Sequence, residues 1–168
     1  SLRSSLEVER TVVDDNPFSK VPVSQEMIED FEVKPLHHNL IRALHSQHPS
    51  YGPSVRLFSS WLCGHSLSGL LSQELIELLV ASVYTSPMSE SAPSSPTAGF
   101  QKTLVRLAGF DWTNCPLIVD FDGHFDQAKR LKVTSAFSNF RQQANKSRSM
   151  YVVSNCDEIL DYKPYSDT

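Results

Sequence analysis

The chain has 168 residues, of which 40% are hydrophobic and 20% are charged, and its formal net charge is −4. This length suits one ordinary domain or slightly more. The apolar runs are only a few residues long, which excludes a membrane-spanning helix. An acidic balance also does not suit a protein that is held to nucleic acid by bulk charge. Three cysteines are few, and their number is odd, which makes a disulfide scaffold unlikely. We therefore expect free thiols at Cys63, Cys115 and Cys156.

Both ends of the chain look like the ends of a fragment. It begins at Ser1 without a methionine and stops in a polar run after Leu160. We therefore expect a fragment of a longer protein, with a connecting segment from a preceding domain over 1–34. We place a helical domain over 35–114 and the start of a following α/β domain over 115–168.

The first half of the chain carries helical periodicity. Its apolar residues recur every three or four positions, as on one face of a helix. Pro53 suits a first helical position, and Ser72 suits an N-cap because its hydroxyl can accept a backbone N–H. We therefore predict five helices, over 25–32, 36–48, 53–71, 73–83 and 100–110.

A stretch rich in serine and proline over 86–98 interrupts this helical block. Its prolines predict a loop that is neither helix nor central strand. A loop of this length either lies extended across a partner or is a surface excursion with no partner, and the sequence leaves both open. The candidate partner-contact residues are Pro87, Pro93, Ser94, Ser95 and Pro96.

The pattern changes after residue 114. Leu117–Val119 and Met150–Val153 are short apolar runs, typical of buried strands. Between them the spacing predicts a helix over 125–143, with its bases outward and four apolar side chains inward: Leu131, Val133, Phe137 and Phe140. A strand, a helix and a strand form a βαβ unit with parallel strands. The sequence thus predicts an α+β fold, mainly helical at first, followed by a βαβ unit that opens a second α/β domain.

The net charge of −4 conceals an uneven distribution. Residues 128–148 hold six bases and no acid, whereas each of the other parts of the chain has more acids than bases. A solvated helix face followed by a loop is the simpler interpretation of this block, and contact with RNA is the alternative. The candidate RNA-binding residues are Lys129, Arg130, Lys132, Arg141, Lys146 and Arg148.

Two carboxylates follow the first predicted strand. Asp120 and Asp122 could hold Mg²⁺ for nucleotidyl or phosphoryl transfer, because that ion prefers oxygen ligands. A nucleotidyltransferase also needs a Gly-Ser turn upstream, and the nearest upstream glycine, Gly109, is followed by Phe110. The further motifs of a haloacid dehalogenase phosphatase are missing too. We therefore interpret Asp122-Gly123 as a turn, and predict no catalytic residue, no metal and no cofactor.

Four histidines cluster near the start of the helical block: His37, His38, His45 and His48. The last two have a spacing that can serve zinc, but the usual cysteine or carboxylate ligands are missing. Cys63 and His65 are two positions apart and so face different sides of a helix. We predict core or surface histidines rather than a metal site.

Five stretches in one order resemble a known family, the Nrap family of nucleolar RNA-associated proteins. The resemblance covers roughly residues 36–122. The stretches are Leu44–Pro53, Val55–Leu62, Leu75–Ser82, Pro93–Phe100 and Phe110–Val119.

Members of that family look like tandem copies of a class I CCA-adding tRNA nucleotidyltransferase, in which a nucleotidyltransferase-like head precedes helical and α/β domains. The resemblance implies that 35–114 is the second helical domain, of the poly(A) polymerase/oligoadenylate synthetase type. It also implies that the catalytic carboxylates are generally lost and that the protein is a nucleolar scaffold of the small-subunit processome, supporting pre-18S rRNA processing. The implied partners are other processome proteins and pre-rRNA, with no membrane and no small-molecule substrate.

Three hypotheses for the function stay open at this point. The first is the non-catalytic scaffold. The second is the substrate-binding domain of an active nucleotidyltransferase that uses Asp120 and Asp122 with Mg²⁺. The third is a generic α/β interaction module whose basic segment binds RNA.

Overall fold

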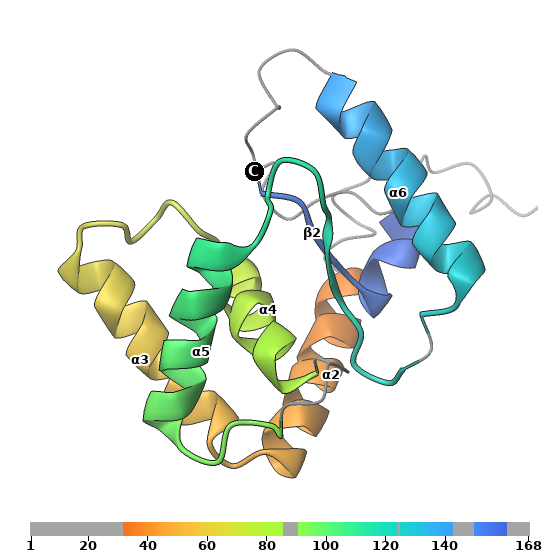
Figure 1. The fold of residues 1–168 in the computed structure, drawn as a ribbon. Coiled ribbons are helices and arrows are strands. Elements are labelled where there is room, and N and C mark those ends of the chain that lie inside the picture. The colour runs from red at the N-terminus through yellow and green to blue at the C-terminus, as the bar shows by residue number, and fades with distance from the viewer. Residues whose placement is uncertain (1–31, 86–90, 124, 143–149, 161–168) are drawn as a thin grey trace, which may run out of the picture.

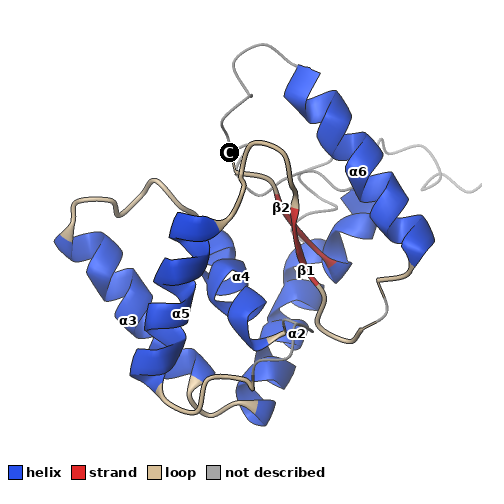
Figure 2. Cartoon of the chain, in the orientation of Figure 1, coloured by secondary structure: helices blue, strands red, loops and turns tan. Residues whose placement is uncertain are grey.

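The computed structural model describes residues 32–85, 91–123, 125–142 and 150–160. The helix expected over 25–32 lies outside them except for its last residue. Helices dominate the described chain, and two short strands follow the first four helices (Figures 1 and 2). The elements are α2 (Lys34–Gln47), α3 (Tyr51–Gly64), α4 (Gln73–Tyr84), α5 (Pro96–Gly109), β1 (Leu117–Val119), α6 (Gln127–Gln142), β2 (Val152–Ser154) and the 3₁₀ helix η2 (Asn155–Leu160).

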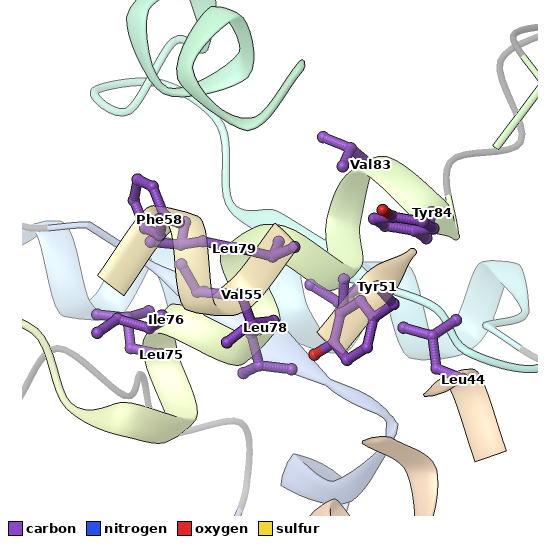
Figure 3. Close-up of a cluster of buried hydrophobic side chains, with 14 of the residues drawn as sticks. Leu44, Tyr51, Val55, Phe58, Leu75, Ile76, Leu78, Leu79, Val83 and Tyr84 are labelled. Atoms are coloured by element: carbon purple, nitrogen blue, oxygen red, sulfur yellow. The ribbon is translucent and has the colours of Figure 1, made fainter. Parts of the chain in front are cut away.

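Helix α4 is the centre of the molecule. Its side chains are buried on most of its circumference, including Leu78, Leu79 and Val80, which are each at most 2% exposed. Helices α3 and α5 pack against it and against each other, and Figure 3 shows Val55 and Phe58 of α3 facing its leucines. A helix that is apolar nearly all round needs such cover on every side, which explains its central place.

The two strands form a parallel sheet and lie between two layers of side chains. Leu117 pairs with Val152, and Val119 pairs with Ser154. Successive side chains of a strand point to opposite faces, so Leu117 and Val119 join the cluster of α3 and α4, while Ile118 joins a second cluster with α6. Helix α6 accordingly lies on the other side of the strands from α4 (Figure 1).

This arrangement confirms the coarse prediction of a mainly helical chain with a strand–helix–strand unit. The described strands are shorter than a typical strand, and β2 begins at Val152 rather than at Met150. The sheet shares its hydrophobic cluster with α3 and α4. A domain boundary near residue 114 stays a prediction.

The start of α5 differs from the prediction. The expected loop over 86–98 is helical from Pro96 onward, because Ser95 is the N-cap and its hydroxyl accepts the N–H of Ala98 at 3.2 Å. Proline at the first helical position loses no hydrogen bond, since that N–H has no partner within the helix. The prediction was wrong there because it took every proline of the 86–98 stretch as a helix breaker.

The end of α3 also differs. The expected helix over 53–71 runs instead from Tyr51 to Gly64. The chain then turns through two residues with positive φ, Ser66 at 58° and Gly69 at 90°, which no right-handed helix contains. The prediction carried the helical spacing of Val55, Phe58 and Leu62 on past Gly64 to Leu71. Leu70, in that added stretch, is 72% exposed.

Helix α6 confirms three of the four inward side chains predicted for it. Val133, Phe137 and Phe140 are buried, whereas Leu131 is 63% exposed. None of the helices in the described parts of the chain has the length and apolarity needed to cross a membrane.

Candidate functional site

Asp120 and Asp122 follow β1, where the alternative hypothesis placed Mg²⁺. The Asp120 carboxylate accepts hydrogen bonds from the backbone N–H groups of Gly123 at 3.0 Å and Phe125 at 3.2 Å. Gly123 has a φ of 72°, in the left-handed region that favours glycine. The two aspartates therefore belong to a tight turn, as the Asp-Gly sequence predicts.

Asn155 joins this turn to the end of β2. Its amide nitrogen donates to Asp122 Oδ1 at 2.5 Å and to Asp120 Oδ1 at 3.4 Å. Its amide oxygen accepts the backbone N–H of Phe121 at 3.0 Å. These hydrogen bonds hold both carboxylates in the turn and occupy some of the roughly four lone-pair positions that each carboxylate could offer a metal ion. Within the described residues, no three His, Cys, Asp or Glu side chains are grouped as metal ligands.

Two buried side chains beside this turn, Asp157 and Cys156, have surroundings that suit a structural role. Asp157 is 1% exposed, and its carboxylate accepts hydrogen bonds from the backbone N–H of Ser154 at 2.5 Å and from its hydroxyl at 3.1 Å. Burial raises the pKa of Cys156 to about 11. Cys156 is thus a thiol at neutral pH, and a thiol is a poor nucleophile compared with a thiolate. Cys63 and Cys115 are exposed and, as predicted, all three cysteines are free.

Three of the histidines contact different parts of the helical block. His37 of α2 is buried and bonds Glu77 of α4, with 3.0 Å between Nε2 and Oε2. His48 lies against the ring of Tyr84, with 5.4 Å between centroids. His65 bonds the carbonyl of Trp61 at 2.8 Å. The contact between His37 and Glu77 fixes α2 on the central helix.

Glu77 makes the stability of the fold depend on pH. Burial opposes ionisation of its carboxyl, but hydrogen bonds from His37 and Gln73 outweigh burial and lower the pKa below 4.5. A lowered carboxyl pKa stabilises the fold above the unfolded-state pKa, and this contribution is lost as the pH falls through the folded-state pKa. We expect Glu77→Gln to flatten the loss of stability below about pH 4.5, measured by urea unfolding at a series of pH values. Glu74→Gln, in the first turn of the same helix, is the control. An equal flattening in both variants would contradict the assignment.

Part of the predicted partner-contact loop is bound to the helices by three hydroxyls, which we call the hydroxyl clasp: Ser50, Ser54 and Tyr84. Ser50 Oγ donates to the carbonyl of Pro93 at 2.7 Å, and Ser54 Oγ donates to the carbonyl of Pro96 at 3.0 Å. Tyr84 Oη lies 3.1 Å and 2.9 Å from the two serine oxygens. The clasp thereby joins the end of α4 and the start of α3 to the start of α5.

The clasp divides the candidate loop residues. Pro93 is buried and Pro96 is half-buried, and the carbonyls of both face the clasp. Ser94 and Ser95 are exposed, while Pro87 lies outside the described residues. A partner-contact role for this loop stays a prediction, with Ser94 and Ser95 as the two described residues at the surface.

The six candidate RNA-binding bases also differ in their surroundings. Lys132 is exposed and Lys129 is half-buried, both on α6. Arg130 is exposed, but its Nε donates to the carbonyl of Phe125 at 3.2 Å. Lys146 and Arg148 lie outside the described residues. Their role in RNA binding stays a prediction.

Arg141 does not point outward as predicted. Its guanidinium donates to the carbonyl of Trp112 and lies 4.8 Å from the ring centroid of Phe137 and 5.7 Å from that of Phe140. Desolvation by burial lowers the pKa of Arg141, although an arginine stays charged at neutral pH. Arg141 therefore fixes the end of α6 to the segment that joins α5 and β1.

We expect Arg141→Ala to loosen α6, because the variant loses a charge-assisted hydrogen bond and the packing of the side-chain stem. The cost should be about 2 kcal/mol, with faster amide exchange confined to α6. Lys132→Ala, on the exposed part of the same helix, should change the free energy of unfolding by less than about 0.5 kcal/mol. Equal losses in the two variants would show that Arg141 does not fix the helix.

Comparisons with known proteins find one protein family and several relatives that match most of this chain. The model of the family described as Nrap protein PAP/OAS1-like domain 5 matches residues 48–162. Nucleolar protein 6 of Xenopus tropicalis is 37% identical over 103 residues, which are 61% of this chain and 9% of that protein. U3 small nucleolar RNA-associated protein 22 of Schizosaccharomyces pombe is 34% identical over 140 residues, which are 80% of this chain and 13% of that protein.

The chain thus spans about a tenth of the length of the curated relatives that it matches. The matched segment begins just before α3 and ends in the run after η2. It includes the clasp, the parallel strands and α6, so the likeness covers both the helical part and the βαβ unit. By this match, the chain belongs to the Nrap protein family.

Proposed function

We propose that this chain is a non-catalytic part of a nucleolar ribosome-biogenesis protein. It supports assembly of the small ribosomal subunit and pre-18S rRNA processing, through contacts with other small-subunit processome proteins and with pre-rRNA. The observation that carries the proposal is the family match over residues 48–162, together with relatives whose names place them in the nucleolus or with U3 small nucleolar RNA. The proposal includes no cofactor and no small-molecule substrate.

The surroundings of the strand-end carboxylates support a structural role. Asp120 accepts two backbone N–H groups, and Asn155 donates to both aspartates. Catalysis by two Mg²⁺-bound carboxylates would need those oxygens to converge on the ion. The alternative function, a substrate-binding domain of an active nucleotidyltransferase that uses Asp120 and Asp122, would require Mg²⁺ to compete with these hydrogen bonds.

Affinity capture tests the proposal. The tagged 168-residue chain should recover ribosome-assembly proteins of the small subunit from nucleolar extract, identified by mass spectrometry. A matched bait with Gly99→Ala, which disturbs the clasp, should recover fewer of them. Recovery of no ribosome-assembly protein by the unaltered chain would count against the proposal.

A further inference from the structure

Helix α6 presents two different surfaces. Its buried side carries Val133, Phe137 and Phe140 against the strands. At 100° per residue, the opposite side carries four exposed residues, which we call the hydroxyl crest: Leu131, Thr134, Ser135 and Ser138. The crest therefore consists of one leucine and three side chains that end in a hydroxyl.

The hydroxyl protons of the crest point inward. Each hydroxyl donates to the backbone carbonyl four residues earlier: Thr134 to Arg130 at 2.8 Å, Ser135 to Leu131 at 3.0 Å and Ser138 to Thr134 at 2.9 Å. A hydroxyl has one proton and two lone pairs. Once the proton is donated to the helix, only lone pairs face the solvent, so the crest accepts hydrogen bonds and does not donate them.

The flanks of the crest are basic. At 100° per residue, Lys132 lies on one flank and Arg130 on the other, and both are exposed, whereas Lys129 lies toward the buried side. Helix α6 contains no acidic residue from Gln127 to Gln142. A ligand that fits this surface carries negative charge at its edges and hydrogen-bond donors between them.

An RNA duplex has this combination. Its phosphates are anionic and only accept hydrogen bonds, whereas the ribose 2′-hydroxyls that line its wide, shallow minor groove can donate. Phosphates suit Lys132 and Arg130, and 2′-hydroxyls suit the lone pairs of the crest. Leu131, which is 63% exposed, matches the apolar C–H edge of a ribose. DNA has the same charges but lacks the 2′-hydroxyl donors.

We propose that the outer face of α6 binds duplex RNA across its minor groove. The flanking bases, Lys132 and Arg130, neutralise phosphates, and the hydroxyl crest accepts hydrogen bonds from 2′-hydroxyls and so distinguishes RNA from DNA. The inference rests on the proposed function for its biological setting, since an RNA-processing particle supplies such duplexes. In a purely electrostatic contact, the bases alone would set the affinity. Here the bases supply affinity and the hydroxyl crest supplies the preference for RNA.

Binding of the 168-residue chain to two duplexes tests the proposal. The probes are an RNA duplex of about 20 base pairs, longer than the roughly 16 that a compact double-stranded RNA domain spans, and the DNA duplex of the same sequence. Affinities are measured by fluorescence anisotropy at a series of salt concentrations. We expect the RNA duplex to bind more tightly than the DNA duplex.

The serine variant tests the crest. Ser135→Ala with Ser138→Ala should lower the affinity for RNA by about threefold to tenfold for each hydroxyl, leave the affinity for DNA unchanged and leave the salt slope unchanged. Alanine is a better helix former than serine, so the variant should keep its fold. Ser46→Ala is the matched control, because Ser46 on α2 is exposed and donates in the same way to the carbonyl of Arg42 at 3.0 Å.

The lysine variant tests the flank. Lys132→Ala should weaken binding to both duplexes and reduce the salt slope by about 1. Arg42→Ala, an exposed base on α2, should leave both slopes unchanged. Polyglutamate serves as a third probe, because an acidic protein segment is the other polyanion that this surface could take.

Three results would overturn the proposal. They are equal affinities for RNA and DNA in the unaltered chain, an RNA preference that survives loss of both serines, and polyglutamate binding as tight as that of the RNA duplex. None of these results would affect capture of ribosome-assembly proteins. Failure of the RNA contact and failure of the proposed function are therefore distinguishable.

Discussion

Gly99→Ala should lower the free energy of unfolding by about 3 kcal/mol, at the upper end of the usual cost of overpacking. A Cβ atom at this position would lie 2.2 Å from Ser54 Oγ, 2.5 Å from Tyr84 Oη and 2.9 Å from Ser54 Cβ. Rotation about the side-chain bond of Ser54 can move its Oγ but not its Cβ. To admit the methyl group, α5 must move off α3 and break the hydroxyl clasp. Urea unfolding followed by circular dichroism measures the loss.

Gly109→Ala is the matched control on the same helix. Apart from the neighbouring backbone of its own helix, no atom lies within 4 Å of the Cβ position there. Alanine should then stabilise α5 by about 0.5–1 kcal/mol, since glycine loses more backbone entropy on folding. Equal unfolding midpoints for the two variants would show that the close approach of α3 and α5 is not what stabilises this region.

Tyr151→Ala should cost about 3–5 kcal/mol, the usual range for removal of a buried aromatic ring. Tyr151 is 1% exposed and makes edge contacts with Phe137 and Phe140, each at 5.2 Å between centroids. These three rings form much of the packing of α6 on the strands. We expect fast amide exchange over the whole of α6 and a lower unfolding midpoint.

Tyr151→Phe separates the ring from the hydroxyl. It keeps the aromatic contacts and should cost no more than about 1.5 kcal/mol, the value of one hydrogen bond. Burial raises the pKa of Tyr151 to about 12, so the phenol is neutral in both states near pH 7. Protection of α6 that survives Tyr151→Ala would contradict the packing described for this helix.

The sequence predicted best where one residue decides the local structure. Ser72 was expected to cap α4, and its Oγ accepts the N–H of Leu75 at 3.2 Å. The turn at Asp122-Gly123 was expected from its residue types, and Gly123 has the positive φ that such a turn needs. Both signals are local, so they require no knowledge of the tertiary packing.

The sequence predicted less where distant segments meet. Gly99 touches side chains 15 and 45 positions earlier in the chain, at Tyr84 and Ser54, and no local pattern marks that contact. Arg141 was placed with the solvated bases, although it donates to the carbonyl of Trp112, 29 positions earlier. Leu131 was grouped with the inward apolar residues of α6, but at 100° per residue it falls on the opposite side of the helix from Val133 and Phe137, where it is 63% exposed.

In the candidate site, too, local features could be predicted from the sequence and contacts between distant segments could not. Residue types alone favoured a turn over a metal site at Asp120 and Asp122, but the donation from Asn155, 33 residues after Asp122, appears only in the fold. The charge pattern singled out the α6 bases, yet it could not separate Lys132 from Arg141. The hydroxyl crest had a weak signal in the sequence, because serines and threonines inside a helix often donate to the carbonyl four residues earlier.

A non-catalytic role for this segment is tested most directly by pre-18S rRNA processing in cells whose full-length protein carries Asp120→Asn and Asp122→Asn. Asparagine keeps an oxygen that can accept the N–H of Gly123 but is a much weaker Mg²⁺ ligand than a carboxylate. We predict normal processing in this variant and slowed processing with Gly99→Ala, which damages the fold. Loss of processing in the double aspartate variant, with an unchanged unfolding midpoint of the 168-residue chain, would contradict the non-catalytic role.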